Sequence, residues 1–235
     1  MQPAGQLSQD GRWLWNGRQW VPYQQPLNAA VAWARPYESA QPRARLATVF
    51  IAIDIGILIP VTALNLMPST ATDNPLVAVL FVLVALVVIA SYPAAVVFYC
   101  MWLHRVVRNM PALGSLDPRW KPSGAVWRCF IPFLNLAHPL LSVLDAWRGS
   151  ERSTHWLDVA ARRSIPVPAA IVWWWIFWLF SDVSNIRVNG STPTAFDVLA
   201  TVTTIVAGLL AIKIIRDLTG RQDRKNDLIA SGQLA

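Results

Sequence analysis

Residues 80–90 read LFVLVALVVIA and lie within a longer apolar run from Leu76 to about Leu103. A helix needs about 20 apolar residues to cross roughly 30 Å of hydrocarbon, so this run is long enough to span a membrane. Apolar runs of similar character lie at about 46–66, 165–183 and 196–215. The sequence therefore predicts four membrane-spanning helices.

The composition of the whole chain agrees with a membrane protein. Of 235 residues, 54% are hydrophobic and only 14% are charged. So few charges do not solvate a globular surface of this size, whereas a lipid-facing surface needs none. The net charge of +7 comes from basic residues that flank the apolar runs and do not gather on a separate domain. We therefore expect the lipid bilayer, and no nucleic acid, as a partner.

A fifth segment, 124–148, is also long enough to span, and the basic residues decide whether it does. If it does not, Lys and Arg divide into five before the first helix, nine between the second and third, five from Lys213 onward, and only Arg187 on the opposite side. If it does, the division becomes ten against nine. Because Lys and Arg concentrate on the cytoplasmic side, the first arrangement is preferred. It predicts a multi-pass protein of the cell (plasma) membrane with both termini in the cytoplasm.

Residues 124–148 then belong at the cytoplasmic surface. Polar side chains recur along this segment at helical spacing, at Arg128, Asn135, His138, Ser142 and Asp145. This pattern predicts an amphipathic interfacial helix with one polar face. Two prolines, Pro132 and Pro139, should kink it or break it into short pieces. Both a re-entrant and a surface position are compatible with the pattern.

The extreme N-terminus, residues 1–24, carries a Trp-rich pattern. Asn16-Gly17 separates two aromatic runs, which predicts a β-hairpin with a two-residue turn. Trp13 and Trp15 share one strand face and can stack on Trp20 across the hairpin. An isolated hairpin is only marginally stable in water. We therefore expect the hairpin and its Trp side chains to dock onto a protein partner, onto lipid headgroups, or onto the linker that follows.

The remaining boundaries follow from composition. Residues 25–45 are rich in Pro, Ala and Gln and are expected to form a flexible linker. Residues 46–217 form the predicted transmembrane domain, and residues 218–235 a polar cytoplasmic tail. The predicted fold is an all-α membrane protein with four transmembrane helices, a Pro-interrupted interfacial helix and a short N-terminal β-hairpin.

The central part of the chain resembles a known bacterial family. Residues 101–109 (MWLHRVVRN), 120–126 (WKPSGAV) and 130–136 (FIPFLNL) resemble the membrane family catalogued as domain of unknown function 4328, over roughly residues 45–220. One departure is His138, before Pro139, where a more typical basic or polar residue is expected from the resemblance. Because the family has no assigned activity, the resemblance supports the topology and implies no reaction.

The N-terminal unit DGRWLWNGRQW (10–20) has a separate resemblance. It is similar to a short Trp-rich module often appended to bacterial membrane proteins. This similarity implies an accessory module and no chemistry.

Asp54 lies near the middle of the first predicted span. An ionisable group there costs about 2.5–3.5 kcal/mol on insertion scales and normally faces a partner. One interpretation is a hydrogen-bonded acid that joins two helices. The other is a proton or ion site on a polar path with Asn135 and His138.

A basic cluster marks the inner end of the second predicted span. His104 with Arg108 and Arg105 with Asn109 form two i,i+4 pairs, and Arg128 follows in the interfacial segment. Such a patch either binds anionic lipid headgroups or an acidic partner, or it only sets the orientation of the helices.

No motif indicates catalysis or a cofactor. The sequence has no Gly-rich phosphate loop, no Gly-x-Ser-x-Gly elbow and no His-Glu-x-x-His helix. Its three His and two Cys lack zinc-type spacing. We therefore expect no enzyme activity, no metal and no cofactor.

Two functional classes remain. The first is a non-enzymatic membrane adaptor or sensor that presents the Trp hairpin and the basic interfacial surface to a protein or lipid partner. The second is a small transporter or channel-like subunit that uses Asp54 and the polar face of the interfacial segment. A connected cavity lined by Asp54, Asn135 or His138 favours the second. Either class is compatible with a homo-oligomer.

Overall fold

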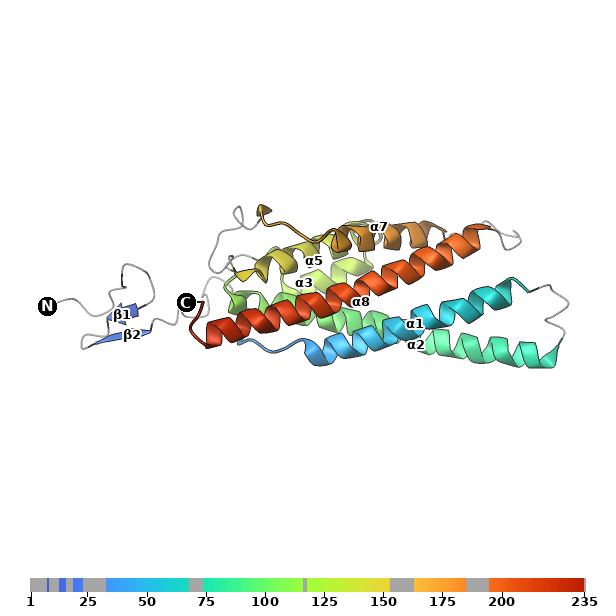
Figure 1. Ribbon diagram of the computed structural model, residues 1–235, viewed down its shortest axis with the longest axis horizontal. Helices are drawn as coiled ribbons and strands as arrows, with labels where there is room; N and C mark the ends of the chain where they lie inside the picture. The colour runs from blue at the N-terminus through green and yellow to red at the C-terminus, as the bar shows by residue number, and fades with distance from the viewer. Residues whose placement is uncertain are drawn as a thin grey trace.

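A computed structural model describes Ser8 and residues 13–15, 19–22, 33–67, 74–115, 118–152, 163–184 and 195–234. Most of these residues are helical (Figure 1). Two short strands, β1 (Trp13–Trp15) and β2 (Trp20–Pro22), pair antiparallel, with Trp15 opposite Trp20. The turn predicted at Asn16-Gly17 lies outside the described residues.

Three helices are long and apolar enough to cross a membrane: α1 (Gln41–Asn65), α2 (Pro75–Asn109) and α8 (Ala195–Ala230). The remaining predicted span, 165–183, corresponds to α7 (Ala169–Ser184), which has only 16 residues. It begins at Ala169 and not at residue 165, because Pro166 and Pro168 disfavour helix in the residues before them. By length alone, the described residues provide three spans where the sequence predicts four.

Local sequence explains where the long helices begin. Pro75 occupies the first turn of α2, where its missing N–H has no helical partner to lose. The side chain of Asn74 accepts a hydrogen bond from the Leu76 N–H at 2.9 Å, which caps the same turn. Pro42 lies at the corresponding position of α1. Both starts are therefore set by residues that favour a helix N-terminus.

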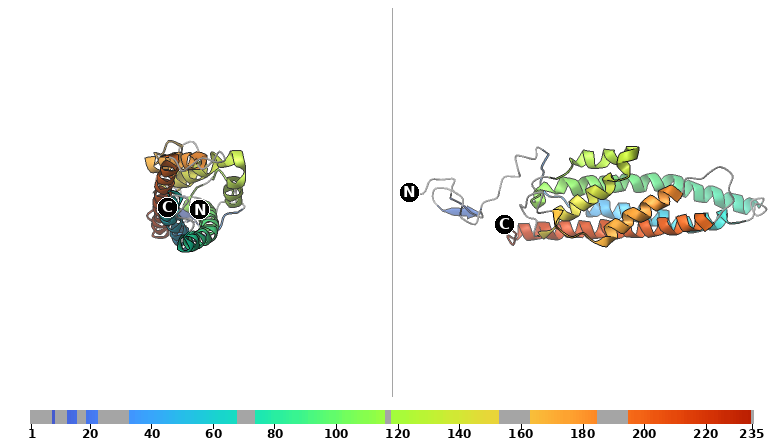
Figure 2. Two further views of the ribbon diagram at one scale, coloured as in Figure 1. Left: turned by 90° about the vertical axis from the view of Figure 1, so that its right-hand side faces the viewer. Right: turned by 90° about the horizontal axis from the view of Figure 1, so that it is seen from above.

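The four long helices form two pairs. α1 packs along α2, α7 packs along α8, and α1 also contacts α8 (Figures 1 and 2). The last contact is close at Gly208 of α8, where an added Cβ would collide with Ile55 of α1. Small residues permit this approach between membrane helices. We call the end of the bundle at which α1 begins and α2 and α8 end the inner end.

The predicted interfacial helix at 124–148 is divided into short pieces. These are α3 (Pro122–Trp127), the 3₁₀ turn η3 (Arg128–Phe130), α4 (Pro132–Asn135) and α5 (His138–Gly149). Ile131 is extended (φ −90°, ψ 120°) before Pro132, which breaks the helix at that proline. Because the helix is broken, the single polar face predicted for it does not form.

Part of the segment predicted as a flexible linker, 25–45, is packed against the bundle. We call residues 33–40 the strap. Glu38 of the strap forms an ion pair with Arg105 of α2, and the Tyr37 hydroxyl donates a hydrogen bond to Asp223 Oδ1 of α8 at 2.6 Å. α1 begins at Gln41, still within the predicted linker. Polar contacts therefore hold residues that composition alone marks as mobile.

The predicted polar tail, 218–235, also needs correction. α8 continues without interruption to Ala230, and its face at 218, 219, 222 and 225 is fully buried, with 0% exposure for Leu218, Thr219, Gln222 and Lys225. These positions recur at helical spacing, so one side of a polar segment is part of the core.

Two apolar clusters hold the helices together. The larger lies at the inner end and joins α1, α2, α3, α5 and α8 around Trp102, Leu103 and Leu218. The smaller joins α5, α7 and α8 around Ile171, Trp174 and Trp175. Towards the outer end, by contrast, many large side chains of α1 and α2 are exposed, as Leu76 (76%) and Ile59 (64%) show. Exposed apolar surface of this kind suits helices that face lipid.

Candidate functional site

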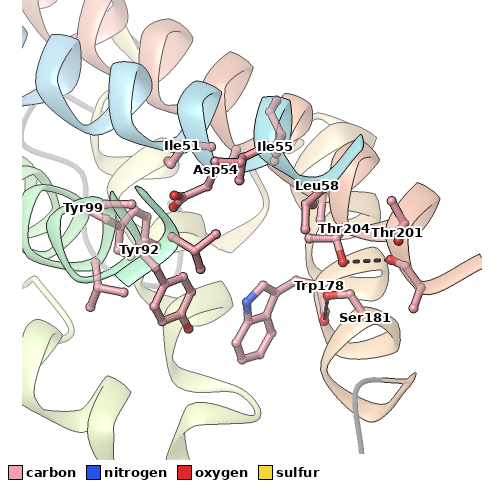
Figure 3. A pocket seen from close by; sticks show the side chains of 18 of the residues that line it. Ile51, Asp54, Ile55, Leu58, Tyr92, Tyr99, Trp178, Ser181, Thr201 and Thr204 are labelled. Atoms are coloured by element: carbon pink, nitrogen blue, oxygen red, sulfur yellow. Dashed lines mark hydrogen bonds between the residues drawn. The ribbon is translucent and has the colours of Figure 1, made fainter. Parts of the chain in front are cut away.

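A cavity of about 660 Å³ lies between the α1–α2 pair and the α7–α8 pair (Figure 3). Residues of all four helices line it, together with residues of η3, α4 and α5. Its volume falls in the range of about 300–1,000 Å³ that small-molecule sites occupy. The size and the apolar walls make it the leading candidate for a binding site in the described part of the chain.

Asp54 provides a carboxyl group in this cavity. Figure 3 shows its side chain leaving α1 on the side where Tyr92 and Tyr99 of α2 lie. The Ser91 hydroxyl donates a hydrogen bond to Asp54 Oδ1, and this bond joins α1 to α2. Asp54 therefore both links two helices and lines the cavity.

Tyr99 has a hydroxyl group that is buried and has no hydrogen-bond partner among the residues that the structure describes. Tyr99 also lines the cavity, and its ring lies 5.5 Å from the ring of Trp102. Buried hydroxyl groups are normally hydrogen-bonded, because an unpaired one costs about 1–3 kcal/mol. The Tyr99 residue therefore contributes to the cavity wall, while its hydroxyl oxygen is enclosed by surrounding protein atoms.

Aromatic rings of α7 form the opposite wall. Trp174, Trp175 and Trp178 line the cavity, and the rings of Trp175 and Trp178 stack at 4.8 Å between centroids. Trp174 and Trp175 also belong to the smaller apolar cluster against α8. This Trp cluster therefore packs the α7–α8 pair and gives the cavity a flat apolar surface suited to an apolar molecule.

Polar groups line the outer part of the cavity. Thr62 of α1 and Thr201 of α8 share a hydrogen bond of 2.8 Å between their hydroxyl oxygens. Asp197, in the first turn of α8, lies on the same lining. At the inner end the chain is tightly packed around the fully buried Trp102. The cavity is thus polar toward its outer part and is bounded by the packed core at its inner end.

Two residues of the predicted basic surface, Arg105 and Asn109, are buried, at 5% and 1% exposure. Asn109 Nδ2 donates to the Glu38 carbonyl oxygen at 2.8 Å, and Asn109 Oδ1 accepts from the Glu38 N–H at 3.4 Å. With the Arg105–Glu38 ion pair, these bonds clamp the strap onto α2. The prediction that both residues face a lipid or protein partner is therefore corrected: their polar groups bind another segment of the same chain.

Tyr37 provides the second anchor of the strap, on α8. Burial and the hydrogen bond to Asp223 raise the pKa of Tyr37 well above its ordinary value. The hydroxyl therefore keeps its proton and its hydrogen bond across the physiological range. No local sequence pattern predicts this contact, because Tyr37 and Asp223 are 186 residues apart.

The other i,i+4 pair of the predicted surface, His104 and Arg108, lines a groove with Trp33 and Arg35 of the strap and Lys121 before α3. Arg128 does not line it. Its guanidinium lies 3.9 Å from the centroid of the Trp120 ring, a cation–π contact. The predicted basic cluster is thus divided among a buried clamp, a groove and an aromatic contact.

The predicted polar path is brought together only in part. Asp54 and Asn135 line the same cavity, whereas His138 is not on its lining. His138 is buried, with Nε2 lying 3.2 Å from both the Ala125 carbonyl oxygen and Ser142 Oγ. Burial lowers the pKa of His138 below its ordinary value. It is therefore a core residue that joins α5 to α3.

The N-terminal Trp residues lie on the paired strands. The rings of Trp15 and Trp20 approach to 5.5 Å between centroids with a tilt of 57°, and Trp13 lies opposite Pro22 in the strand register. Trp20 is 38% exposed. Its exposed ring surface is available to a partner.

The described residues contain no group of three His, Cys, Asp or Glu side chains arranged to hold a metal ion. The sequence missed Tyr99, whose unpaired hydroxyl depends on the packing around it, and Glu38, whose role depends on the fold of the strap. Helical spacing offered one usable signal, since the buried positions 218, 222 and 225 repeat every three or four residues.

The model of one protein family, the domain of unknown function DUF4328, matches residues 62–220. The chain belongs to this family. The DUF4328 match covers the end of α1 from Thr62, α2, the short helices, α7, and α8 as far as Gly220. β1, β2, the strap and most of α1, including Asp54, lie outside it. Searches of curated proteins and of solved structures gave no match to the chain.

Proposed function

We propose that this DUF4328 protein is a non-enzymatic membrane adaptor or sensor that binds an amphipathic molecule from the bilayer in the cavity between its helix pairs. The observation that carries the proposal is a cavity of about 660 Å³ that combines apolar aromatic walls with the carboxyl group of Asp54. Such sites are mostly apolar with a few polar groups that orient the ligand.

The proposed topology has four membrane crossings with both termini in the cytoplasm of the plasma membrane. α7 is the crossing added to α1, α2 and α8, because it is apolar and packs along α8; its 16 residues extend for about 24 Å, less than the roughly 30 Å of hydrocarbon. The uneven distribution of Lys and Arg, with only Arg187 on the outer side, supports this orientation. The inner end of the bundle then faces the cytoplasm.

The ligand chemistry follows from Asp54. Its carboxyl group offers two oxygens, of which Oδ1 already accepts a bond from Ser91. A ligand whose head group donates a hydrogen bond, such as an alcohol, complements the carboxyl group. A carboxylate head group is less suited, since it would lie beside the carboxyl group of Asp54. We therefore propose a long-chain alcohol-like amphiphile as the ligand class.

The N-terminal strands serve as the adaptor part in this proposal. The strap is fixed by Glu38 and Tyr37 to α2 and α8, so the chain tethers the Trp strands, with the exposed Trp20, to the inner end. A change in the cavity can reach the strap through α2, because Tyr99 and Arg105 belong to the same helix.

Photocrosslinking tests the cavity directly. The full chain in phosphatidylcholine nanodiscs is exposed to a diazirine-bearing long-chain alcohol, and the labelled peptides are mapped by mass spectrometry. Val96 lines the cavity, whereas the next residue, Val97, does not and is 53% exposed. Val96→Trp should remove the labels on α1, α7 and α8, and Val97→Trp should leave them. Equal labelling of both variants, or labels confined to exposed faces, would rule out the cavity site.

A small transporter or channel-like subunit is the second candidate. It is favoured by the shared lining, which contains both Asp54 and Asn135. In liposomes it predicts a proton-linked flux that Asp54→Asn abolishes while the protein stays folded. Against this candidate is the packed core around Trp102, which bounds the cavity at its inner end. An absence of flux in liposomes with the intact chain would remove the transporter from consideration.

A further inference from the structure

A second site lies at the inner end of α2, apart from the cavity. It is a groove of about 280 Å³, lined by Trp33, Arg35, His104, Arg108, Lys121, Pro122 and Ser123. The lining residues come from three separate parts of the chain: the strap, α2, and the start of α3. Four of the seven are basic or titrate to a cation, and none is acidic.

The contacts that hold Glu38 explain how the basic side chains of the groove come together. Asn109 and Arg105 hold the strap at Glu38, three residues after Arg35, and so keep Arg35 beside α2. His104 and Arg108 lie one helical turn apart on a neighbouring face of α2, and both line the groove. The sequence pattern of two i,i+4 pairs therefore separates into one pair that fixes the strap and one that lines the groove.

Among the residues that the structure describes, no acidic side chain lines the groove. The acid nearest in sequence to Arg35, Glu38, already pairs with Arg105, and Asp223 accepts a hydrogen bond from Tyr37. Within the part of the chain that the structure describes, no salt bridge involves Arg35, Arg108 or Lys121. Converging cations without a counter-charge attract an anion, and guanidinium groups favour phosphate because two N–H groups bind two oxygens at once.

The position of the groove relative to the membrane indicates the source of the anion. The apolar part of α2 ends at Leu103, and the groove begins with the next residue, His104. Side chains at this point lie at the level of the headgroups of the leaflet they face. Trp33 adds an amphipathic ring of the kind enriched at that level. In the proposed orientation, this leaflet is the cytoplasmic one.

We infer that the groove formed by Trp33, Arg35, His104, Arg108 and Lys121 binds the phosphate of an anionic lipid headgroup from the cytoplasmic leaflet. The inference rests on the proposed function only for the orientation of the bundle, and it does not depend on a ligand in the cavity. It assigns the strap a second role, since docking of the strap completes the groove with Arg35 and Trp33.

Native mass spectrometry of retained lipid tests the site. The full chain is released from nanodiscs of phosphatidylcholine mixed with phosphatidylglycerol, and the lipid adducts are counted. The variant Arg108→Gln/Lys121→Gln removes two groove cations that make no contact with the strap clamp. Each cation near an anionic surface contributes enough for the pair to weaken phosphatidylglycerol binding about thirtyfold. Arg108→Lys/Lys121→Arg keeps the charges and should keep most of the binding.

The matched control is Arg45→Gln/Arg216→Gln, which removes two exposed cations near the same end of the bundle and outside the groove. It should leave phosphatidylglycerol adducts unchanged. An equal loss in the control would show attraction to general surface charge and overturn the site. Displacement of the lipid by soluble glycerol phosphate at similar concentration would point to a free phosphate ligand and overturn the lipid source.

The two proposals fail separately. Val96→Trp should lose the cavity label and keep its phosphatidylglycerol adducts, whereas the groove variant should do the reverse. If the groove variant unfolds, the charge-conserving variant decides the question: weak binding in that folded protein would contradict the phosphate site. Loss of both signals in Val96→Trp would contradict the independence of the groove from the cavity.

Discussion

The inner half of the helical domain is joined by side-chain hydrogen bonds, whereas the outer half encloses a cavity. At the inner end, Trp102 Nε1 donates to Thr219 Oγ1 at 2.9 Å and Gln222 Nε2 donates to the Val106 carbonyl oxygen at 3.0 Å. Lys225, fully buried, donates to the Gly149 carbonyl oxygen at 3.1 Å. The first two bonds join α8 to α2, and the third joins α8 to α5.

Farther out, the bonds between helices are fewer and involve Asp54 with Ser91 and Thr62 with Thr201. The two halves of α8 therefore have different roles. Its inner half supplies specific packing, and its outer half leaves a volume that a ligand can occupy. Substitutions at Trp102, Asn109, Asp54 and His138 test this difference between the two halves.

Trp102→Ala should cause the largest loss of stability. Trp102 is fully buried in the larger apolar cluster and bonds Thr219, so its removal leaves a cavity and an unpaired hydroxyl. The expected cost is about 3–5 kcal/mol, measured by equilibrium unfolding of the purified protein in detergent. Trp127→Ala, at a residue that is 51% exposed, is the control and should cost much less. Equal costs would contradict the assignment of the stable core to the inner half.

Asn109→Leu should release the strap. The substitution preserves the approximate volume and removes both bonds to the Glu38 backbone, at a cost of about 1–3 kcal/mol. Limited proteolysis should then cut residues 33–40 faster than in the unchanged protein. Arg108→Leu alters the next residue back along α2, which makes no bond to the strap, and should not speed this cut. Equal cutting in both variants would show that the clamp does not hold the strap.

Two substitutions of Asp54 test the outer half of the helical domain. Asp54→Asn keeps size and hydrogen bonding, whereas Asp54→Leu removes the bond from Ser91. Leu should cost about 0.6–1.7 kcal/mol, the range for hydrogen bonds between membrane helices, and Asn should be nearly neutral. Unfolding in detergent measures both. An Asn variant as unstable as the Leu variant would mean that the ionised carboxylate itself stabilises the fold.

His138 should give the smallest effect, a change with pH. Burial lowers its pKa, and the charges of Arg128 and Arg119 lower it further, while hydrogen bonds to the backbone of Ala125 and Gly124 act in the opposite direction. Below the ordinary pKa of about 6.5 the unfolded chain takes up a proton before the folded one does. Stability from this group is therefore complete above about pH 6.5 and falls as the pH is lowered toward the folded pKa.

The measurement for His138 is the pH dependence of unfolding, compared with that of His138→Gln. Carboxyl groups also titrate at low pH, so the informative quantity is the difference between the two proteins. This difference should shrink as the pH falls below about 6.5. A difference that stays constant with pH would indicate that His138 is not held neutral in the core.

The sequence predicted the helical class and the three longest helices because runs such as 80–90 carry a strong local signal. It also placed the break at Pro132 correctly, since a proline acts on its own neighbourhood. It missed the packed strap, because the contacts of Glu38 are made with α2, far along the chain. It missed the buried face of 218–225, because Gln222 and Lys225 are polar by composition and become core residues only through partners distant in the chain. Asp54 stood out in the sequence because a charge within an apolar run is rare, and the structure places it on the cavity lining.

The two cysteines offer the most direct test of the cavity. Cys100 and Cys129 are the only cysteines of the chain, both are free, and both line the cavity. Burial raises the pKa of Cys129 to about 11, so the reaction is run at alkaline pH to supply thiolate. The rate of modification by membrane-permeant N-ethylmaleimide is measured in nanodiscs with and without decanol.

An occupied cavity predicts that decanol slows modification of both thiols, and that Val96→Trp slows it already without decanol while Val97→Trp does not. Modification rates that decanol leaves unchanged at both Cys100 and Cys129 would contradict a ligand site between the helix pairs.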